Sequence, residues 1–178
     1  MSDKCYEDEL DIEEVKKALY EIYRVLYKHR HIYKRPSHLV ATYTEAFANQ
    51  PWTWKVVGIT RNALDVLAAN DFEMPSHQIC RGHFIDRKTT IKEMFSRDEP
   101  MRFDEFWEAA IERDRTVLMT YKENGKGKLF PEYISFDAGD LFADGVGVTY
   151  RKAEKTFLRK MHSELTPHGL TPKALAGS

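Results

Sequence analysis

The spacing of apolar residues constrains the fold of this chain more than any other feature. Apolar side chains recur every three or four residues at Ile12, Val15, Leu19, Ile22 and Leu26, which predicts an amphipathic helix over residues 11–29. Of these, Ile12, Leu19, Ile22 and Leu26 are expected in the core. Similar spacing predicts helices near 36–47, 60–69, 86–95, 104–111 and 153–165. The short runs 79–85, 116–121 and 132–136 are expected to be extended. This pattern predicts an α+β fold, with about five helices packed around a small, mainly antiparallel sheet.

The expected connections follow from the residues that punctuate these segments. The turn residues Asn124–Gly127 predict a hairpin between 116–121 and 132–136, and residues 146–150 are a candidate third strand. Gly58 is expected to end an extended run over 52–57, and Thr60 to cap the next helix. A glycine turn before a short amphipathic helix is also typical of a helix-turn-helix, with recognition residues Arg61, Asn62 and Asp65.

Length and composition indicate one domain. The chain has 178 residues, which we divide into a single domain over 1–166, with 1–10 as a flexible acidic arm, and a flexible tail over 167–178. No apolar run approaches the ~20 residues of a membrane helix, so we expect no membrane partner. Two cysteines, Cys5 and Cys80, are too few for a disulfide framework, which favours a reducing, cytoplasmic location.

The net charge of −1 conceals strongly segregated charges. Residues 1–14 and 98–114 are acidic, whereas 151–160 is basic and 22–44 contains no acidic residue at all. Within 22–44, cations stand beside tyrosines, a combination that suits a phosphate backbone with stackable bases. The predicted nucleic-acid-binding residues are Tyr23, Arg24, Tyr27, Lys28, Lys34 and Arg35. The alternative is that the tyrosines extend the edge of the core or mark a dimer interface, while the cations are only solvated.

The segment Cys80-Arg81-Gly82-His83 is the main candidate for chemistry. A neutral His83 could serve as a general base, and Arg81 and Arg87 could hold a phosphate; these three are the predicted catalytic residues. Gly82 would allow a ligand to approach closely. The alternative is structural, with Asp86 capping the next helix. Cys80, beside apolar neighbours, is expected to be a core residue rather than a nucleophile.

Arg81-Gly82-His83 is similar to part of the Asp-Arg-Gly-His motif of the non-specific ββα-metal nucleases. The resemblance implies a general-base role for His83 and a metal-binding asparagine further along, for which Asn124 is the nearby candidate. It covers three residues, and Cys80 stands where that family has aspartate.

These patterns predict a nucleic-acid-handling protein and, more specifically, a phosphodiester hydrolase that uses the Arg-Gly-His segment. The sequence does not identify metal ligands, and magnesium is the candidate cofactor. The alternative is a non-catalytic interaction protein that docks a protein partner, or a second copy of itself, through its acidic and basic faces.

Overall fold

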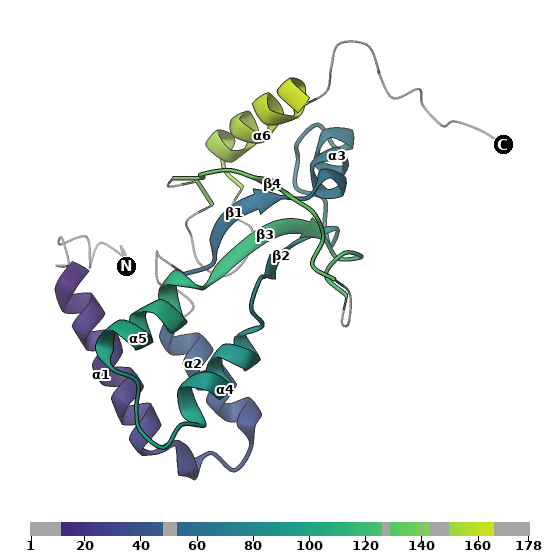
Figure 1. The fold of residues 1–178 in the computed structure, drawn as a ribbon. Helices are drawn as coiled ribbons and strands as arrows, with labels where there is room; N and C mark the ends of the chain where they lie inside the picture. The colour runs from purple at the N-terminus through teal and green to yellow at the C-terminus, as the bar shows by residue number, and fades with distance from the viewer. Residues whose placement is uncertain (1–11, 48–52, 126–128, 140, 143–149, 166–178) are drawn as a thin grey trace, which may run out of the picture. The chain divides into compact units, whose positions relative to one another are not determined.

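The computed structural model describes residues 12–47, 53–125, 129–139, 141–142 and 150–165 (Figure 1). The chain divides into two compact units. Unit 1 comprises Met1–Lys55, His83–Thr116 and Ala143–Val146; unit 2 comprises Val56–Gly82, Val117–Phe142 and Gly147–Ser178. The predicted arm at 1–10, the tail at 167–178 and most of the candidate strand at 146–150 lie outside the described residues.

Unit 1 is helical, and its elements follow the predicted segments closely. They are α1 (Ile12–Lys28), a short 3-10 turn η1 (Arg30–Ile32), α2 (Pro36–Phe47), α4 (Arg87–Phe95), α5 (Phe103–Trp107) and a turn of π-helix η2 (Glu108–Glu112). Asp86 caps α4 by accepting a hydrogen bond from the Lys88 N–H at 2.8 Å, as the sequence predicts. Among the described residues, no helix has the length and apolarity required to cross a membrane.

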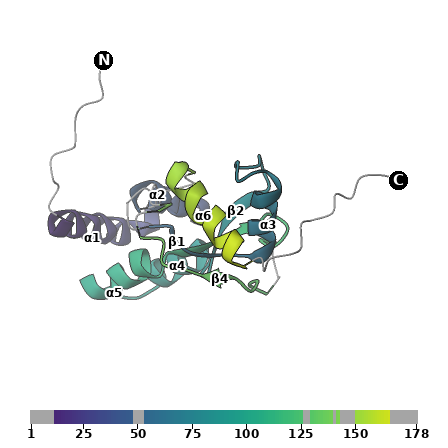
Figure 2. The ribbon, with the colours of Figure 1, turned by 90° about the horizontal axis from the view of Figure 1, so that it is seen from above.

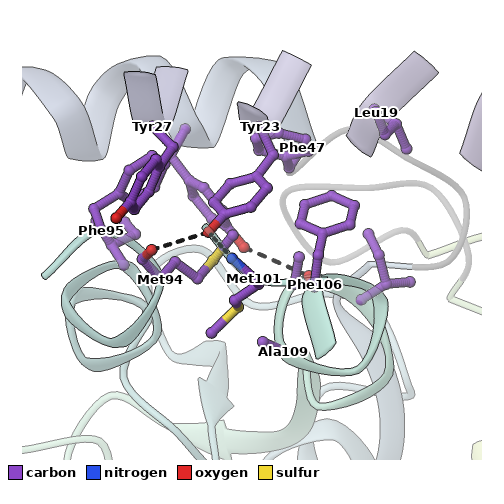
Figure 3. Close-up of a cluster of buried hydrophobic side chains, with 13 residues drawn as sticks. Leu19, Tyr23, Tyr27, Phe47, Met94, Phe95, Met101, Phe106 and Ala109 are labelled. Atoms are coloured by element: carbon purple, nitrogen blue, oxygen red, sulfur yellow. Dashed lines mark hydrogen bonds between the residues drawn. The ribbon is translucent and has the colours of Figure 1, made fainter. Parts of the chain in front are cut away.

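The core of unit 1 is aromatic, and it changes which face of α1 is buried (Figure 3). Leu19 is buried and Leu26 is partly buried, as predicted, but Ile22 is 42% exposed. The prediction for Ile22 was wrong because the buried stripe is centred on Leu19 and Tyr23 rather than on the aliphatic residues alone. The side chain of Ile12 lies outside the described part of the chain.

Tyr23 forms hydrogen bonds that connect α1 to the end of α4 and to the segment after it. Its ring is fully buried and stacks on Phe106 with a centroid separation of 5.1 Å. Its hydroxyl donates to the Met94 carbonyl at 3.1 Å and accepts from the Met101 N–H at 2.8 Å (Figure 3). A buried tyrosine with both hydrogen-bonding functions satisfied acts as a structural anchor.

Unit 2 is built on a four-stranded sheet in the order β2-β3-β1-β4. The strands are β1 (Lys55–Ile59), β2 (Ile79–His83), β3 (Arg115–Thr120) and β4 (Ile134–Ser135), and the end residues Lys55, His83, Arg115 and Thr116 count with unit 1. β4 pairs antiparallel with β1. The bonds Tyr121 N–H to Gln78 and Phe84 N–H to Arg115 make β2 antiparallel to β3. The bonds Lys55 N–H to Asp114 and Thr60 N–H to Leu118 make β1 parallel to β3, so the sheet is mixed. The structure therefore confirms an α+β fold, with two of the three strand pairings antiparallel.

Two details of this sheet differ from the predictions. The expected hairpin between 116–121 and 132–136 does not form, because β4 pairs with β1 and β3 lies between β2 and β1. Gly58 does not end β1 but lies inside it, opposite Ser135. A Cβ at this glycine would lie 2.4 Å from the Tyr133 ring and 2.7 Å from the Ile134 carbonyl oxygen, so glycine permits the close approach of β4.

Two helices complete unit 2: α3 (Arg61–Ala69) and α6 (Lys152–Leu165). They contact each other and lie over the same face of the sheet in both views (Figures 1 and 2). Leu64 and Leu67 of α3 and Leu158 of α6 are fully buried against Val56 and Leu118. Thr60 caps α3 as predicted, accepting a hydrogen bond from the Ala63 N–H at 3.1 Å. Because α3 follows a strand rather than a helix, the helix-turn-helix interpretation was wrong.

We predict that Leu19→Ala lowers the free energy of unfolding by about 2–5 kcal/mol, because it opens a cavity in the aromatic core. Ile22→Ala is the matched control on the same helix, and its cost should stay below about 0.5 kcal/mol because Ile22 is exposed. Urea unfolding of both variants measures the difference. Equal losses would show that the buried face of α1 is assigned incorrectly.

Candidate functional site

The buried carboxylate of Asp114 organises the strongest cluster of ionisable side chains in unit 1. The Asp114 side chain is 9% exposed and lies between two basic groups. Its Oδ1 is 3.1 Å from His83 Nε2, and its Oδ2 accepts a hydrogen bond from Arg87 Nη2 at 2.8 Å. Oδ2 also accepts from the backbone N–H of Trp54 at 3.1 Å. Residues from three separate parts of the chain thus meet at one carboxylate, which we call the His83 cluster (Trp54, His83, Arg87, Asp114).

Aromatic contacts hold the two basic groups of the His83 cluster in place. The Arg87 guanidinium lies 4.1 Å from the Trp54 ring centroid, and the His83 and Trp54 rings are 4.2 Å apart. Trp54 has φ of +58°, a left-handed conformation that bulky residues rarely adopt. Its N–H bond to Asp114 is therefore one of the contacts that hold an unfavourable backbone conformation.

Local structure explains why these residues converge. His83 ends β2 and Arg87 begins α4, so only the short connection capped by Asp86 separates them. Asp114 follows the π-helical turn η2, and its N–H donates to the Ile111 carbonyl at 3.1 Å before β3 begins. Turns of π-helix occur frequently at functional sites.

The basic groups around Asp114 lower its pKa by more than burial raises it. Burial alone raises the pKa of this carboxyl group, whereas the interactions with His83 and Arg87 lower it. Their sum holds the pKa below its ordinary value, so Asp114 is ionised at neutral pH.

The His83 cluster retains hydrogen-bonding capacity for a ligand. Nε and Nη1 of Arg87 are buried and have no hydrogen-bond acceptor among the described residues. His83 Nε2 is also buried, and its 3.1 Å contact with Asp114 does not have the alignment of a hydrogen bond. Because these nitrogens are enclosed by protein atoms, an oxyanion could reach Arg87 only if the cluster opened. Within the described ranges, no three His, Cys, Asp or Glu side chains gather where they could hold a metal ion.

The structure brings together two of the three predicted catalytic residues. His83 and Arg87 flank Asp114 in unit 1, but Arg81 belongs to unit 2, where its Nη2 donates to the Phe142 carbonyl at 2.7 Å. Arg81 is 6% exposed and therefore braces the loop at Phe142 rather than facing solvent. Sequence reasoning missed Asp114 and Trp54, because nothing in the local sequence links either residue to His83.

Gly82 has a packing role instead of the predicted ligand-facing one. A Cβ at Gly82 would lie 2.4 Å from both Sδ and Cε of Met119, so a buried side chain of β3 fills the space beside it. Cys80 is half-buried, and burial raises the pKa of its thiol despite a hydrogen bond from Asn124. Cys80 is therefore not part of the buried core, contrary to the prediction, and the side-chain amide of Asn124 contacts its thiol at 3.5 Å.

We predict that Gly82→Ala destabilises unit 2 by roughly 1–3 kcal/mol through overpacking against Met119. In a Met119→Ala background the added methyl group has room, and its cost should fall below about 0.5 kcal/mol. A double-mutant cycle by urea unfolding measures this coupling. Additive effects of the two changes would rule out Met119 as the reason for glycine at this position.

The predicted nucleic-acid-binding residues separate into two groups. Arg24, Lys28, Lys34 and Arg35 are all exposed, and no ion pair joins them to a carboxylate within the described residues. Tyr23 and Tyr27 are 0% and 6% exposed, so their rings cannot stack on bases. Their hydroxyls are also engaged, because Tyr27 donates to the Arg97 carbonyl at 2.6 Å and Tyr23 donates to Met94. The structural alternative for these two tyrosines therefore holds.

Unit 1 also contains a groove of about 800 Å³ lined by η1, α2 and α4. Its lining includes the basic residues Arg30, Lys88 and Lys92 and the apolar or aromatic residues Tyr33, Ile91 and Phe95. No carboxylate is among its described lining residues. We call this feature the basic groove; Lys88 and Lys92, two of its three cations, lie outside the basic stretch 22–44 singled out in the sequence.

No family model, no curated protein and no solved structure matches this chain. The His83 cluster and the basic groove are the two features of unit 1 that bear on function.

We predict that the contribution of Asp114 to stability is present at neutral pH and is lost on acidification. Its folded-state pKa lies below the ordinary value of 3.8, so the contribution is complete above about pH 4 and disappears as the pH falls through the folded-state pKa. Asp114→Asn should be less stable than wild type near neutrality, and the gap should narrow below about pH 4. Free energies of unfolding across that range provide the measurement. A gap that is constant with pH would contradict an ionised, stabilising Asp114.

Proposed function

We propose that this protein handles nucleic acid and hydrolyses phosphodiester bonds at the His83 cluster. The observation that carries the proposal is the buried Asp114 carboxylate between His83 and Arg87, with two Arg87 nitrogens still lacking acceptors among the described residues. A general base beside an anion-binding guanidinium is what attack of water on a phosphodiester requires.

Each residue of the cluster has a distinct role in the proposed reaction. Asp114 favours the neutral His83 tautomer with its proton on Nε2, which leaves the lone pair on Nδ1. Nδ1 takes a proton from water as the water oxygen bonds to phosphorus and the bond to the leaving ribose oxygen breaks. The leaving oxygen takes a proton from solvent. Arg87 donates from Nε and Nη1 to the non-bridging oxygens, and Asp114 is a positioning residue that stabilises the imidazolium.

Magnesium and a cytoplasmic location remain part of this proposal. The free thiol of Cys80 fits a reducing compartment. Magnesium is the candidate cofactor, and the comparison of activity with magnesium and with EDTA tests whether the protein requires it.

The second candidate is a non-catalytic protein that docks a partner through its charged faces. One observation favours it: the side chains of His83 and Arg87 are each only 14% exposed, as expected of an internal brace. Under this alternative, the His83 cluster fixes the conformation of Trp54 and contributes stability only.

The two candidates predict opposite results for His83→Ala. If His83 is the base, cleavage should fall at least about 100-fold while the melting temperature changes little. If the cluster is a brace, the melting temperature should fall by several degrees without any effect on a specific activity. His77→Ala is the matched control, because His77 is an exposed histidine of unit 2.

The assay is cleavage of single- and double-stranded DNA and RNA, with magnesium, with manganese or with EDTA. We expect the wild type and His77→Ala to cleave at least one substrate equally well, and Asp114→Asn to retain less activity than either. Absence of cleavage by the wild type in every condition would overturn the hydrolase and leave the interaction protein.

A further inference from the structure

We propose that the basic groove of unit 1 binds single-stranded nucleic acid. This inference rests on the proposed function for the class of ligand, and it adds a binding site and a preference for single strands. The groove is formed by η1, α2 and α4, and therefore lies within one compact unit.

Its charge favours an anionic ligand. Lys88 and Lys92 are exposed and lie one turn apart on α4, so their ammonium groups reach the same side of the helix. Neither forms an ion pair with a described carboxylate. Arg30 is held more rigidly, since its guanidinium lies 3.9 Å from the Tyr27 ring centroid and donates to the Tyr27 carbonyl at 2.8 Å. Three cations without an opposing carboxylate in the lining suit the phosphates of an anionic strand.

The floor of the groove favours exposed bases over a closed duplex. Tyr33, Leu39 and Val40 line the groove and are only partly buried, so a ligand can contact them. Ile91 and Phe95 are 5% and 6% exposed and belong to the core beneath. A duplex presents mainly phosphates on its outer surface, whereas a single strand also offers base faces to an apolar or aromatic wall. The combination of cations and apolar wall therefore fits a single strand better than a duplex.

The position of the groove also favours nucleic acid over an acidic peptide. Lys88 of the groove directly follows Arg87 of the His83 cluster on α4. Arg87 itself does not line the groove and its two nitrogens without acceptors are buried, so the two features are linked by their shared helix α4. An acidic peptide would match the lysines but has no use for the adjoining His83 cluster.

Fluorescence anisotropy of the full chain with labelled oligo-dT, oligo-rU and a duplex of equal length tests this proposal in EDTA. We expect tighter binding of the single strands, with log affinity falling against log salt with a slope of about −2 for three cations. Lys88→Gln and Lys92→Gln should each make that slope shallower by about 0.7. Lys152→Gln is the control, because Lys152 is an exposed lysine outside the groove lining, and it should leave binding unchanged.

Tyr33 tests the aromatic part of the groove separately from charge. Tyr33→Ala should weaken single-strand binding at least about fivefold and leave the salt slope unchanged, while Tyr33→Phe should bind as wild type does. Melting curves of each variant confirm that the protein is folded.

Several outcomes would overturn the assignment. Wild-type affinity in both lysine variants would exclude the groove as the binding site, as would equal binding of duplex and single strand. Tighter binding of an oligo-glutamate peptide than of the oligonucleotide at the same salt would assign the groove to an acidic protein partner instead. Groove-dependent binding without cleavage overturns the proposed hydrolase alone, whereas cleavage that is indifferent to the groove variants overturns the groove alone.

Discussion

The burial of one carboxylate, Asp114, is the constraint on which the candidate site depends. An ionised carboxylate in a nearly closed environment is tolerated only when donors surround it, because an unpaired buried charge is strongly destabilising. Asp114 meets this requirement with the Trp54 N–H, with Arg87 and with the imidazole of His83. These contacts join the residues before β1, the end of β2 and the start of α4 to the start of β3. The same contacts that stabilise unit 1 therefore also define its reactive groups.

A site built in this way combines structural and chemical roles in the same atoms. Arg87 uses one nitrogen for Asp114 and its face for Trp54, and two nitrogens remain without acceptors among the described residues. A completed ion pair would leave no donor of Arg87 without an acceptor. These two nitrogens therefore make the cluster a candidate anion site. Lys88 and Lys92 of the basic groove add positive charge further along α4. The groove therefore suits a strand with several phosphates rather than a single phosphate.

The sequence predicted local structure well and long-range pairing poorly. Apolar spacing located the helices, and the capping residues Thr60 and Asp86 were identified correctly because caps act over three residues. Ile22 was misplaced because tyrosines can form a core centre as well as its edge, and the pattern of letters does not distinguish the two. The partner of β4 was missed because hairpin rules assume that sequence neighbours pair, whereas packing placed β4 beside β1.

The sequence also predicted the local part of the candidate site and missed the residue that comes from a distant segment. His83 and Arg87 are near neighbours in sequence, so their proximity could be inferred, and alternation along β2 suggested that Arg81 would join them. The division of the chain instead assigns Arg81 to unit 2, with a carbonyl partner at Phe142. Asp114 lies in an acidic stretch where no feature distinguishes it from the surface carboxylates around it. Only the fold could reveal that this one carboxylate is buried.

The most direct test of this account is the protonation of His83, read from a long-range ¹H–¹⁵N NMR spectrum of the neutral side chain. We predict a single tautomer with the proton on Nε2, the nitrogen 3.1 Å from the Asp114 carboxylate, and an unprotonated Nδ1. A proton on Nδ1, or a ring that averages between the two tautomers, would contradict it, because Asp114 would not then orient the group to which the chemistry is assigned.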